Sequence, residues 1–416
     1  MEREVVITGI GVVSPNGIGC EAYKKALLAG ESGIGQISLF EAGALDCRIA
    51  GEVRLNGNHF SRKEERNLPR VAQFSILAAR EAFESSGLEP SKLSKEERYR
   101  FGVVLGTGGG SVEFMEKHYQ MYYGKRPLDP SIYVISASTP GGLSSELSIR
   151  FGMLGLSHVI TTGCTSSTDA LGYATSEIRR GRLDVVLAGG ADAPIAEGIM
   201  QGFLLMRIVP TKWNDAPEKA SRPFNKDREG FVLSEGSWMF VLEEKERARR
   251  RAAVIYGEIA GYGSSCEAFH PVSLQYDGTA NMRAISLAAE EARVSPDKID
   301  HVNLHGTATP LNDEIETQAM KQFFGKRAYE IPMNSTKSMI GHPQGASGAA
   351  GLAATLLLMQ EDMIHPTINL DSPDPKCDLD YVPYKARQKR IDYALCNTLG
   401  FGSKCSALLV KRSSGE

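Results

Sequence analysis

Short aliphatic and β-branched runs alternate with amphipathic segments along almost the whole chain. The runs predict strands at Val5–Thr8, Gly102–Leu105, His158–Thr161, Val185–Ala188, Met239–Leu242, His301–Leu304 and Ala407–Val410. Helical periodicity predicts helices at Ser61–Ser86, Ser166–Arg180, Thr279–Ala292, Asp313–Phe324 and Ala346–Met359. This alternation indicates α/β architecture with mainly parallel sheets. The run VVLAGG, which is apolar throughout, indicates sheets covered on both faces.

The chain divides into two parts with similar content. The charged stretch EEKERARRR at Glu243–Arg251 is typical of a solvated helix end, and it separates residues 1–251 from residues 252–416. In the first part a predicted strand enters a polar loop at Cys164, and in the second part strands enter loops at His305 and at 337–342. Because ligands bind beyond the carboxyl ends of strands in such sheets, we expect these three loops to converge.

Composition narrows the class of protein. The 416 residues carry 47 Lys and Arg against 50 Asp and Glu, a net charge of −3, which argues against general nucleic-acid binding. The most apolar helical segment, Gly348–Met359, is too short for a membrane span of about 20 residues, and the N-terminal segment does not have the order of a signal peptide. Seven scattered cysteines without a CxxC pair favour a reduced, cytoplasmic protein over a disulfide framework or zinc ribbon.

Cys164 has the local setting of a nucleophile. It sits at a tight turn between a predicted strand and a predicted helix, after Gly163, and Thr165 or Ser166 is placed to cap the helix. A helix N-terminus stabilises a thiolate through its dipole and its free N–H groups. A buried structural cysteine is the commoner fate of this residue type, and the other six cysteines fit it well. The polar turn favours the functional interpretation for Cys164 alone.

Two histidines and a lysine are candidate partners of Cys164. His305 directly follows a buried-type strand, and His342 precedes a helix of small residues. Metal binding by the two histidines is not expected, because no HxxxH or HxH spacing accompanies them. Lys337 lies among Ser, Thr, Met and Ile, which predicts a partly buried ammonium that needs an acidic partner. Asp313 and Glu316, one helical turn apart, are the candidates, and helix N-terminal placement is compatible with both.

Two glycine-rich segments leave alternatives open. Gly400-Phe401-Gly402 fits a tight loop close to a site and a simple hairpin turn equally well. GTGGG at Gly106–Gly110 lacks the GxGxxG spacing, and no Walker lysine follows it, so nucleotide binding is not expected.

Together these motifs resemble the β-ketoacyl-acyl-carrier-protein synthases of the thiolase superfamily. The resemblance runs from Val5 to Val410 and rests on TTGCTSS around Cys164, HGTATPLND from His305, STKSMIGH ending at His342, SRPFNKDREGF from Ser221, and GFG at 400–402. It implies a thiolase-like fold in which two similar α/β halves form an α-β-α-β-α arrangement of five layers. Stretches at 162–174, 191–195 and 373–383 are most similar to the ketosynthase α subunit of type II polyketide synthases.

This resemblance implies an acyltransferase that performs a decarboxylative Claisen condensation and lengthens an acyl chain by two carbons. Cys164 would take the acyl chain, and neutral His305 and His342 would stabilise the enolate that malonyl decarboxylation leaves. Lys337, paired with Glu316, would set the charge of the site. The backbone N–H groups of Cys164 and Phe401 would form an oxyanion hole. Further family positions are the gating-loop residues Phe401 and Gly402 and the supporting residues Glu316, Asp313, Thr307 and Thr309.

The resemblance also implies partners. No cofactor is required, because the substrates ride on the phosphopantetheine of an acyl carrier protein. The second expected partner is a chain-length factor, a homologue without the active-site cysteine, in a heterodimer. Because carrier proteins are acidic, we expect a basic docking face, although an ordinary charged surface explains the same residues equally well. The candidate docking residues are Lys63, Arg66, Arg70, Lys125, Arg126 and Arg207.

Three other functions compete with this prediction. A β-ketoacyl synthase II of fatty-acid biosynthesis would use the same residues. A non-catalytic subunit similar to a chain-length factor would not need Cys164 together with two histidines. A cysteine hydrolase would not need a second histidine and a lysine in one loop. The family commonly has GFGG, whereas this chain has GFGSKC with Ser403, a departure that fits neither the polyketide nor the fatty-acid branch cleanly.

Overall fold

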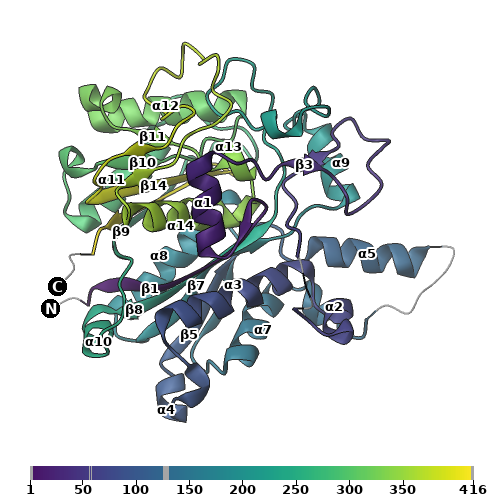
Figure 1. The fold of residues 1–416 in the computed structure, drawn as a ribbon, viewed down its shortest axis with the longest axis vertical. Coiled ribbons are helices and arrows are strands. Elements are labelled where there is room, and N and C mark those ends of the chain that lie inside the picture. Colours follow the sequence, from purple (N-terminus) through teal and green to yellow (C-terminus); the bar gives the residue numbers. More distant parts are fainter. Residues whose placement is uncertain (1–2, 56, 58, 125–130, 414–416) are drawn as a thin grey trace.

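The computed structural model describes residues 3–55, 57, 59–124 and 131–413. Its main sheet is built from two units of five strands (Figure 1). The first unit contains β1 (Val5–Ser14), β5 (Phe101–Gly106), β6 (Ser157–Ile160), β7 (Val185–Asp192) and β8 (Gly236–Glu244). The second contains β9 (Gly257–Cys266), β10 (His301–Asn303), β11 (Met333–Asn334), β14 (Tyr393–Gly400) and β15 (Lys404–Lys411).

The two units repeat one topology. Their spatial orders are β6-β5-β7-β8-β1 and β11-β10-β14-β15-β9. Counted along the chain, the third strand of each unit lies at an edge of the whole sheet, and the first strand lies at its centre, next to the other unit. Both orders run through two parallel pairings and then two antiparallel pairings. The units join through a short antiparallel contact of β1 with β9. The boundary between residues 251 and 252 lies between α10 (Lys245–Arg250) and β9, and it stays a prediction.

Helices form the other three layers. α8 (Ser166–Arg179) and α14 (Ser347–Met359) contact each other between the two strand units. The first unit is covered by α3 (Arg70–Ser86) and α7 (Gly141–Phe151), and the second by α11 (Thr279–Ala292) and α12 (Pro310–Phe324) (Figure 1). The expected five-layer, thiolase-like arrangement is therefore confirmed.

Sequence explains why α14 occupies the central layer. All its residues are buried, and a helix that is apolar on every side needs a neighbour on every side. Gly348 allows the close approach to α8, because a Cβ at this position would lie 1.9 Å from the Thr168 hydroxyl. The central layer therefore brings the start of α14 next to the start of α8, and both starts lie at the site described below.

Two predicted helices differ from those observed. The segment 61–86 forms two helices, α2 (Arg62–Asn67) and α3, because Pro69 has no N–H and holds Leu68 in an extended conformation. α12 begins at Pro310 rather than Asp313, with proline in the first turn, where its missing N–H costs nothing.

The remaining elements are short or peripheral. No helix of the described residues is long and apolar enough to cross a bilayer. These elements are α1 (Cys20–Ala29), α4 (Lys95–Arg98), α5 (Val112–Tyr123), α6 (Val134–Ser138), α9 (Glu197–Leu205), α13 (Lys337–Ile340), β2 (Gly17–Ile18), β3 (Gly35–Gln36), β4 (Ile49–Ala50), β12 (Met363–Ile364) and β13 (Arg387–Gln388).

Candidate active site

The loops after three strands and one short helix meet around one cavity of about 250 Å³. Cys164 reaches it from the loop after β6, His305 from the loop after β10, His342 from the loop after α13, and Phe401 from the turn after β14. Cys164 Sγ and one ring nitrogen of each histidine lie within 4.8 Å of one another. The structure therefore brings together the nucleophile and the two histidines that were selected from the sequence.

Cys164 lies in a short 3₁₀ turn, Gly163–Thr165, that leads into α8. Gly163 takes a φ of 75°, which favours glycine. Neither Thr165 nor Ser166 caps α8 as predicted, because the Ser166 hydroxyl accepts from the Thr162 N–H (2.9 Å) and donates to the Gly163 carbonyl (2.6 Å). The serine stabilises the turn that presents the cysteine instead.

The pKa of the Cys164 thiol depends on burial, which raises it, and on nearby positive groups, which lower it. Burial raises the pKa of the thiol to about 11, although the Lys337 charge and the backbone N–H groups of Phe401 and Cys164 itself pull it down. The resting group is therefore a thiol that must lose its proton when it attacks. The same two N–H groups would donate to an oxyanion on a carbonyl bound to the sulfur.

Both histidines are buried and neutral. Burial and the Lys337 charge hold the pKa of His305 and of His342 well below the usual range. Their ring centroids are 5.3 Å apart and the planes meet at 87°. The Ser347 hydroxyl hydrogen-bonds His342 Nδ1 at 2.9 Å, and with the hydroxyl as donor the ring proton sits on Nε2. His342 is then a hydrogen-bond donor without a positive charge.

Glu316 orders the loop that carries His305. Its carboxylate accepts from the backbone N–H groups of His305 (2.7 Å) and Gly306 (2.8 Å) and from Asn397 Nδ2 (2.6 Å). Burial raises its pKa. Lys337 is also buried, and burial lowers the pKa of its ammonium. Among the ion pairs of the described residues none joins Lys337 to Glu316, so the expected direct pair is replaced by attraction at longer range.

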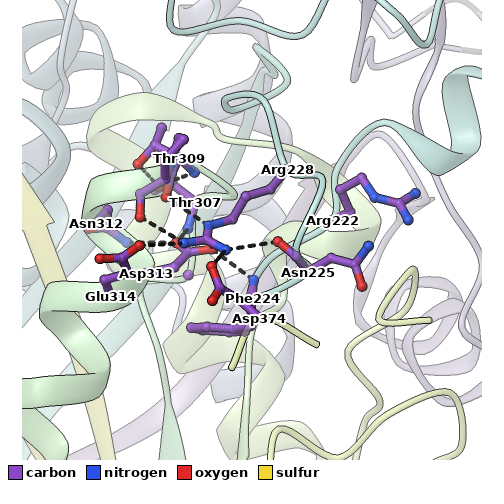
Figure 2. Close-up of polar contacts among 12 residues, drawn as sticks. Arg222, Phe224, Asn225, Arg228, Thr307, Thr309, Asn312, Asp313, Glu314 and Asp374 are labelled. Carbon is purple, nitrogen blue, oxygen red and sulfur yellow. Dashed lines mark hydrogen bonds and ion pairs between the residues drawn. The ribbon is translucent and has the colours of Figure 1, made fainter. Parts of the chain in front are cut away.

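Asp313 and Arg228 hold the turn that carries Thr307 and Thr309 (Figure 2). The Asp313 carboxylate accepts from the Thr307 N–H at 3.1 Å and lies 3.5 Å from Arg228 Nε. The Arg228 guanidinium, which is buried, also donates to the Thr309 carbonyl (3.3 Å) and to Asp374 (2.7 Å). The Thr307 and Thr309 hydroxyls are 3.0 Å apart, and both residues line the cavity. Arg228 therefore positions this wall of the cavity, a role that the sequence did not reveal.

The GTGGG segment is explained by Asp192, a second residue that sequence reasoning missed. The buried Asp192 carboxylate accepts from the Thr107 hydroxyl (2.8 Å) and from the N–H groups of Gly108 (2.7 Å), Gly109 (3.1 Å) and Gly345 (2.7 Å). Burial raises its pKa to about 6. The glycine loop therefore wraps a carboxylate that also fixes the segment between His342 and α14.

The predicted docking residues differ in their contacts and exposure. Arg70 is not free, because Nε donates to Glu235 Oε1 (3.0 Å) and Oε2 (2.8 Å), and Glu235 is fully buried. Its guanidinium also bonds the Val53 carbonyl, so Arg70 is engaged in contacts within the chain, and its role in docking stays a prediction. Three of the others are exposed, namely Lys63, Arg66 and Arg207. Two lie outside the described residues, namely Lys125 and Arg126.

Cys164, His305 and His342 are also the donor set in the described residues with the spacing of a metal site. Thiolate and imidazole suit zinc. A zinc-bound histidine usually donates its other ring N–H to a carboxylate or carbonyl. The buried Nδ1 of His305 has no hydrogen-bond partner of this kind. The donor set therefore fits a nucleophile with two polar neighbours better than it fits a metal.

Comparison with known proteins identifies the family. Models described as "Beta-ketoacyl synthase, N-terminal domain" and "Beta-ketoacyl synthase, C-terminal domain" match residues 2–248 and 256–371. The chain belongs to the β-ketoacyl synthase family. It is therefore a condensing enzyme of the acyltransferase type, as the resemblance implied.

Individual relatives cover nearly the whole chain. The tetracenomycin polyketide synthase ketoacyl synthase alpha subunit of Streptomyces glaucescens is 42% identical over 99% of this chain and 97% of its own. The 3-oxoacyl-[acyl-carrier-protein] synthase 2 of Synechocystis is 38% identical over 99% and 98%. A solved type II polyketide synthase acyl-carrier protein in complex with its ketosynthase matches with a TM-score of 0.91 at 32% identity, with full coverage of both chains.

Proposed function

We propose that this β-ketoacyl synthase is the ketosynthase α subunit of a type II polyketide synthase. It catalyses decarboxylative Claisen condensation of malonyl-carrier protein with an acyl chain held on Cys164. The observation that carries the proposal is the buried cluster of one thiol and two neutral imidazoles, all within 4.8 Å, in a cavity that Phe401 also lines. The stretches at 162–174, 191–195 and 373–383 favour the polyketide branch.

Acyl transfer comes first. Cys164 Sγ attacks the acyl thioester and the carrier thiol departs, taking up the proton that the cysteine loses by way of a neighbouring imidazole. The backbone N–H groups of Cys164 and Phe401, which stabilise negative charge at this position, would hold the oxyanion of the tetrahedral intermediate. The product is an acyl-cysteine in a cavity without charged side chains in its lining.

Condensation follows. Malonyl-carrier protein loses carbon dioxide, and the electrons of the broken C–C bond form an enolate whose oxygen accepts hydrogen bonds from His305 and His342. Two neutral donors suit this oxyanion because neither gives up its proton. The enolate carbon then attacks the acyl-cysteine carbonyl, the Cys164 thiolate leaves, and the chain is two carbons longer.

The supporting residues receive separate roles. Glu316 keeps His305 in place by accepting a hydrogen bond from the His305 backbone N–H. The Lys337 charge keeps both imidazoles neutral and stabilises the departing Cys164 thiolate. Thr307 and Thr309, on the wall held by Asp313, would contact the malonyl group or its pantetheine arm. This chemistry requires no cofactor.

The partners we propose are an acidic acyl carrier protein and a chain-length factor. Exposed Lys63, Arg66 and Arg207 remain candidates for carrier docking. Strand β6 lies at a sheet edge, and the nearby Ile132, Ile135 and Ile149 are 87%, 74% and 78% exposed, which is typical of a surface that a partner covers. All seven cysteines are free, which supports a cytoplasmic location.

A fatty-acid synthase role is the second candidate, favoured by the 38% identity to the cyanobacterial 3-oxoacyl synthase. The test is chain extension from acyl-carrier and malonyl-carrier protein, with the chain alone and with a co-expressed cysteine-less homologue. Full activity only with the homologue supports the polyketide role. A stable, active homodimer that makes ordinary fatty acyl chains would replace it with the fatty-acid role.

A further inference from the structure

The atypical residue of the GFGSKC loop is buried and strained. Ser403 lies in the turn between β14 and β15, where the family commonly has a second glycine. Its φ is 63°, a left-handed conformation that costs a serine about 1 kcal/mol or more, and its side chain is 1% exposed. A residue with a strained backbone persists when its contacts offset the strain, so the contacts of Ser403 show what holds it in place.

All the polar contacts of Ser403 go to one neighbouring segment. Its hydroxyl donates to the His270 carbonyl (3.0 Å) and accepts from the His270 N–H (3.3 Å). Its carbonyl accepts from the Glu267 N–H at 2.8 Å, and the Gly402 N–H donates to the Pro271 carbonyl at 2.7 Å. Glycine at 403 would keep the two backbone contacts and lose both hydroxyl contacts.

The two joined segments both line the catalytic cavity. Phe401 comes from one of these walls, and Val272, Ser273 and Leu274 come from the other. The cavity volume of about 250 Å³ lies just below the range of about 300–1,000 Å³ usual for small-molecule pockets. A long acyl chain with its pantetheine arm therefore requires these walls to separate.

We propose that the Ser403 hydroxyl is a latch between the Phe401 loop and segment 267–274, and that it sets how readily the Cys164 cavity admits long acyl thioesters. Ser403 is a positioning residue, since it acts through the two walls without touching the reacting atoms. The latch itself stands on contacts within this chain, while its effect on acyl selection rests on the proposed function. The latch predicts that the two walls stay together until the Ser403 hydroxyl contacts break.

Hydrogen exchange tests the latch without reference to catalysis. In Ser403→Ala and in Ser403→Gly, we expect peptides that cover 267–274 to exchange about tenfold faster, because two hydrogen bonds are lost. Ser265→Ala is the matched control, because Ser265 lies in β9 just before segment 267–274, and the change removes its hydroxyl contact to the Ala280 carbonyl of α11 and leaves the latch intact. Unchanged exchange in both variants would overturn the latch. Faster exchange in Ser403→Gly alone would show that the cause is the changed backbone strain at residue 403 and not the loss of the hydroxyl.

Acylation tests the consequence. Rates of Cys164 acylation by dodecanoyl and acetyl pantetheine thioesters, followed by intact-protein mass, should give a long-to-short ratio about fivefold higher in both Ser403 variants than in the wild type. A ratio within twofold of the wild type would overturn the role in selection. Failure of wild-type Cys164 to acylate at all would contradict the proposed function, whereas the exchange result would still decide the latch.

Discussion

The two halves share one strand order but supply different chemistry from equivalent loops. Cys164 follows β6, the edge strand of the first half, and Lys337 follows β11, the edge strand of the second. After the second strand of each half comes a glycine-containing loop, Gly106–Gly110 after β5 and the His305 loop after β10. In the first half this loop wraps Asp192 and contributes no side chain to the cavity, while in the second it presents the His305 imidazole that we propose as a donor to the enolate.

The two loops are also held in different ways. Asp192 ends β7, the fourth strand of the first half, and accepts backbone N–H groups of the glycine loop directly. Asn397, on the fourth strand of the second half, acts through Glu316, which accepts the N–H groups of His305 and Gly306. The fourth strand of each half thus supports a loop, and in the proposed mechanism one half supplies the nucleophile while the other supplies the donors to the enolate.

Removal of a histidine should break this division most strongly. We expect His305→Ala or His342→Ala to lower carbon dioxide release from malonyl-carrier protein by about 10²–10³-fold, because each would remove one donor to the enolate oxygen. Acylation of Cys164 should survive at least in part, which intact-protein mass measures alongside the released carbon dioxide. Decarboxylation near the wild-type rate in both variants would assign the role to other groups.

Asp192→Asn tests the supporting role of the first half. The amide would turn an N–H₂ group toward backbone N–H donors such as that of Gly108 or Gly345, and we expect the free energy of unfolding to fall by about 2–3 kcal/mol. Denaturant unfolding measures this change. Thr107→Val, which removes one donor to the same carboxylate and the acceptor of the Gly110 N–H, is the comparison and should cost less, about 1–2 kcal/mol. Equal costs would argue against Asp192 as the organiser of the loop.

Lys337→Met sharpens the electrostatic contrast between the halves. Because burial raises the pKa of Cys164 to about 11, its alkylation by iodoacetamide should rise about tenfold for each pH unit between pH 7 and 9. The Lys337 charge opposes this rise in pKa, so its loss should raise the pKa further and slow alkylation by about tenfold at pH 7. The effect should shrink toward pH 9, because burial lowers the pKa of Lys337 to about 8 and its ammonium is largely deprotonated there. Peptide mapping separates Cys164 from exposed Cys266, and Lys298→Met is a surface control. Faster alkylation in Lys337→Met would have the wrong sign.

Ser347→Ala should have the smallest effect. It removes the hydroxyl that bonds His342 Nδ1 and leaves the ring in place, so we expect decarboxylation to fall by about threefold to tenfold. Acylation should stay within twofold of the wild type. The pH profile of decarboxylation distinguishes tautomer control from general damage, and a loss equal to that of His342→Ala would show that Ser347 maintains the local structure instead.

The sequence predicted the reacting groups better than their supports. Cys164 and His305 lie in loops that follow strands, and His342 lies in the segment after the next strand, so their convergence at one edge of the sheet followed from the sequence pattern. Asp192 and Arg228 were missed because many of their partners are backbone groups, which carry no sequence signature, and their side-chain partners lie far away in the sequence. The expected Lys337–Glu316 pair failed for the same reason, since Glu316 is already occupied by backbone N–H donors.

The most direct test of the division between the halves is carbon dioxide release by Cys164→Ala. This variant loses the nucleophile of the first half and keeps His305, His342 and Lys337 of the second. We predict that it takes no acyl group and extends no chain, yet still decarboxylates malonyl-carrier protein at a rate comparable to that of the acylated wild type. Loss of decarboxylation together with acylation, in a variant that folds normally, would contradict the assignment of the two steps to separate halves.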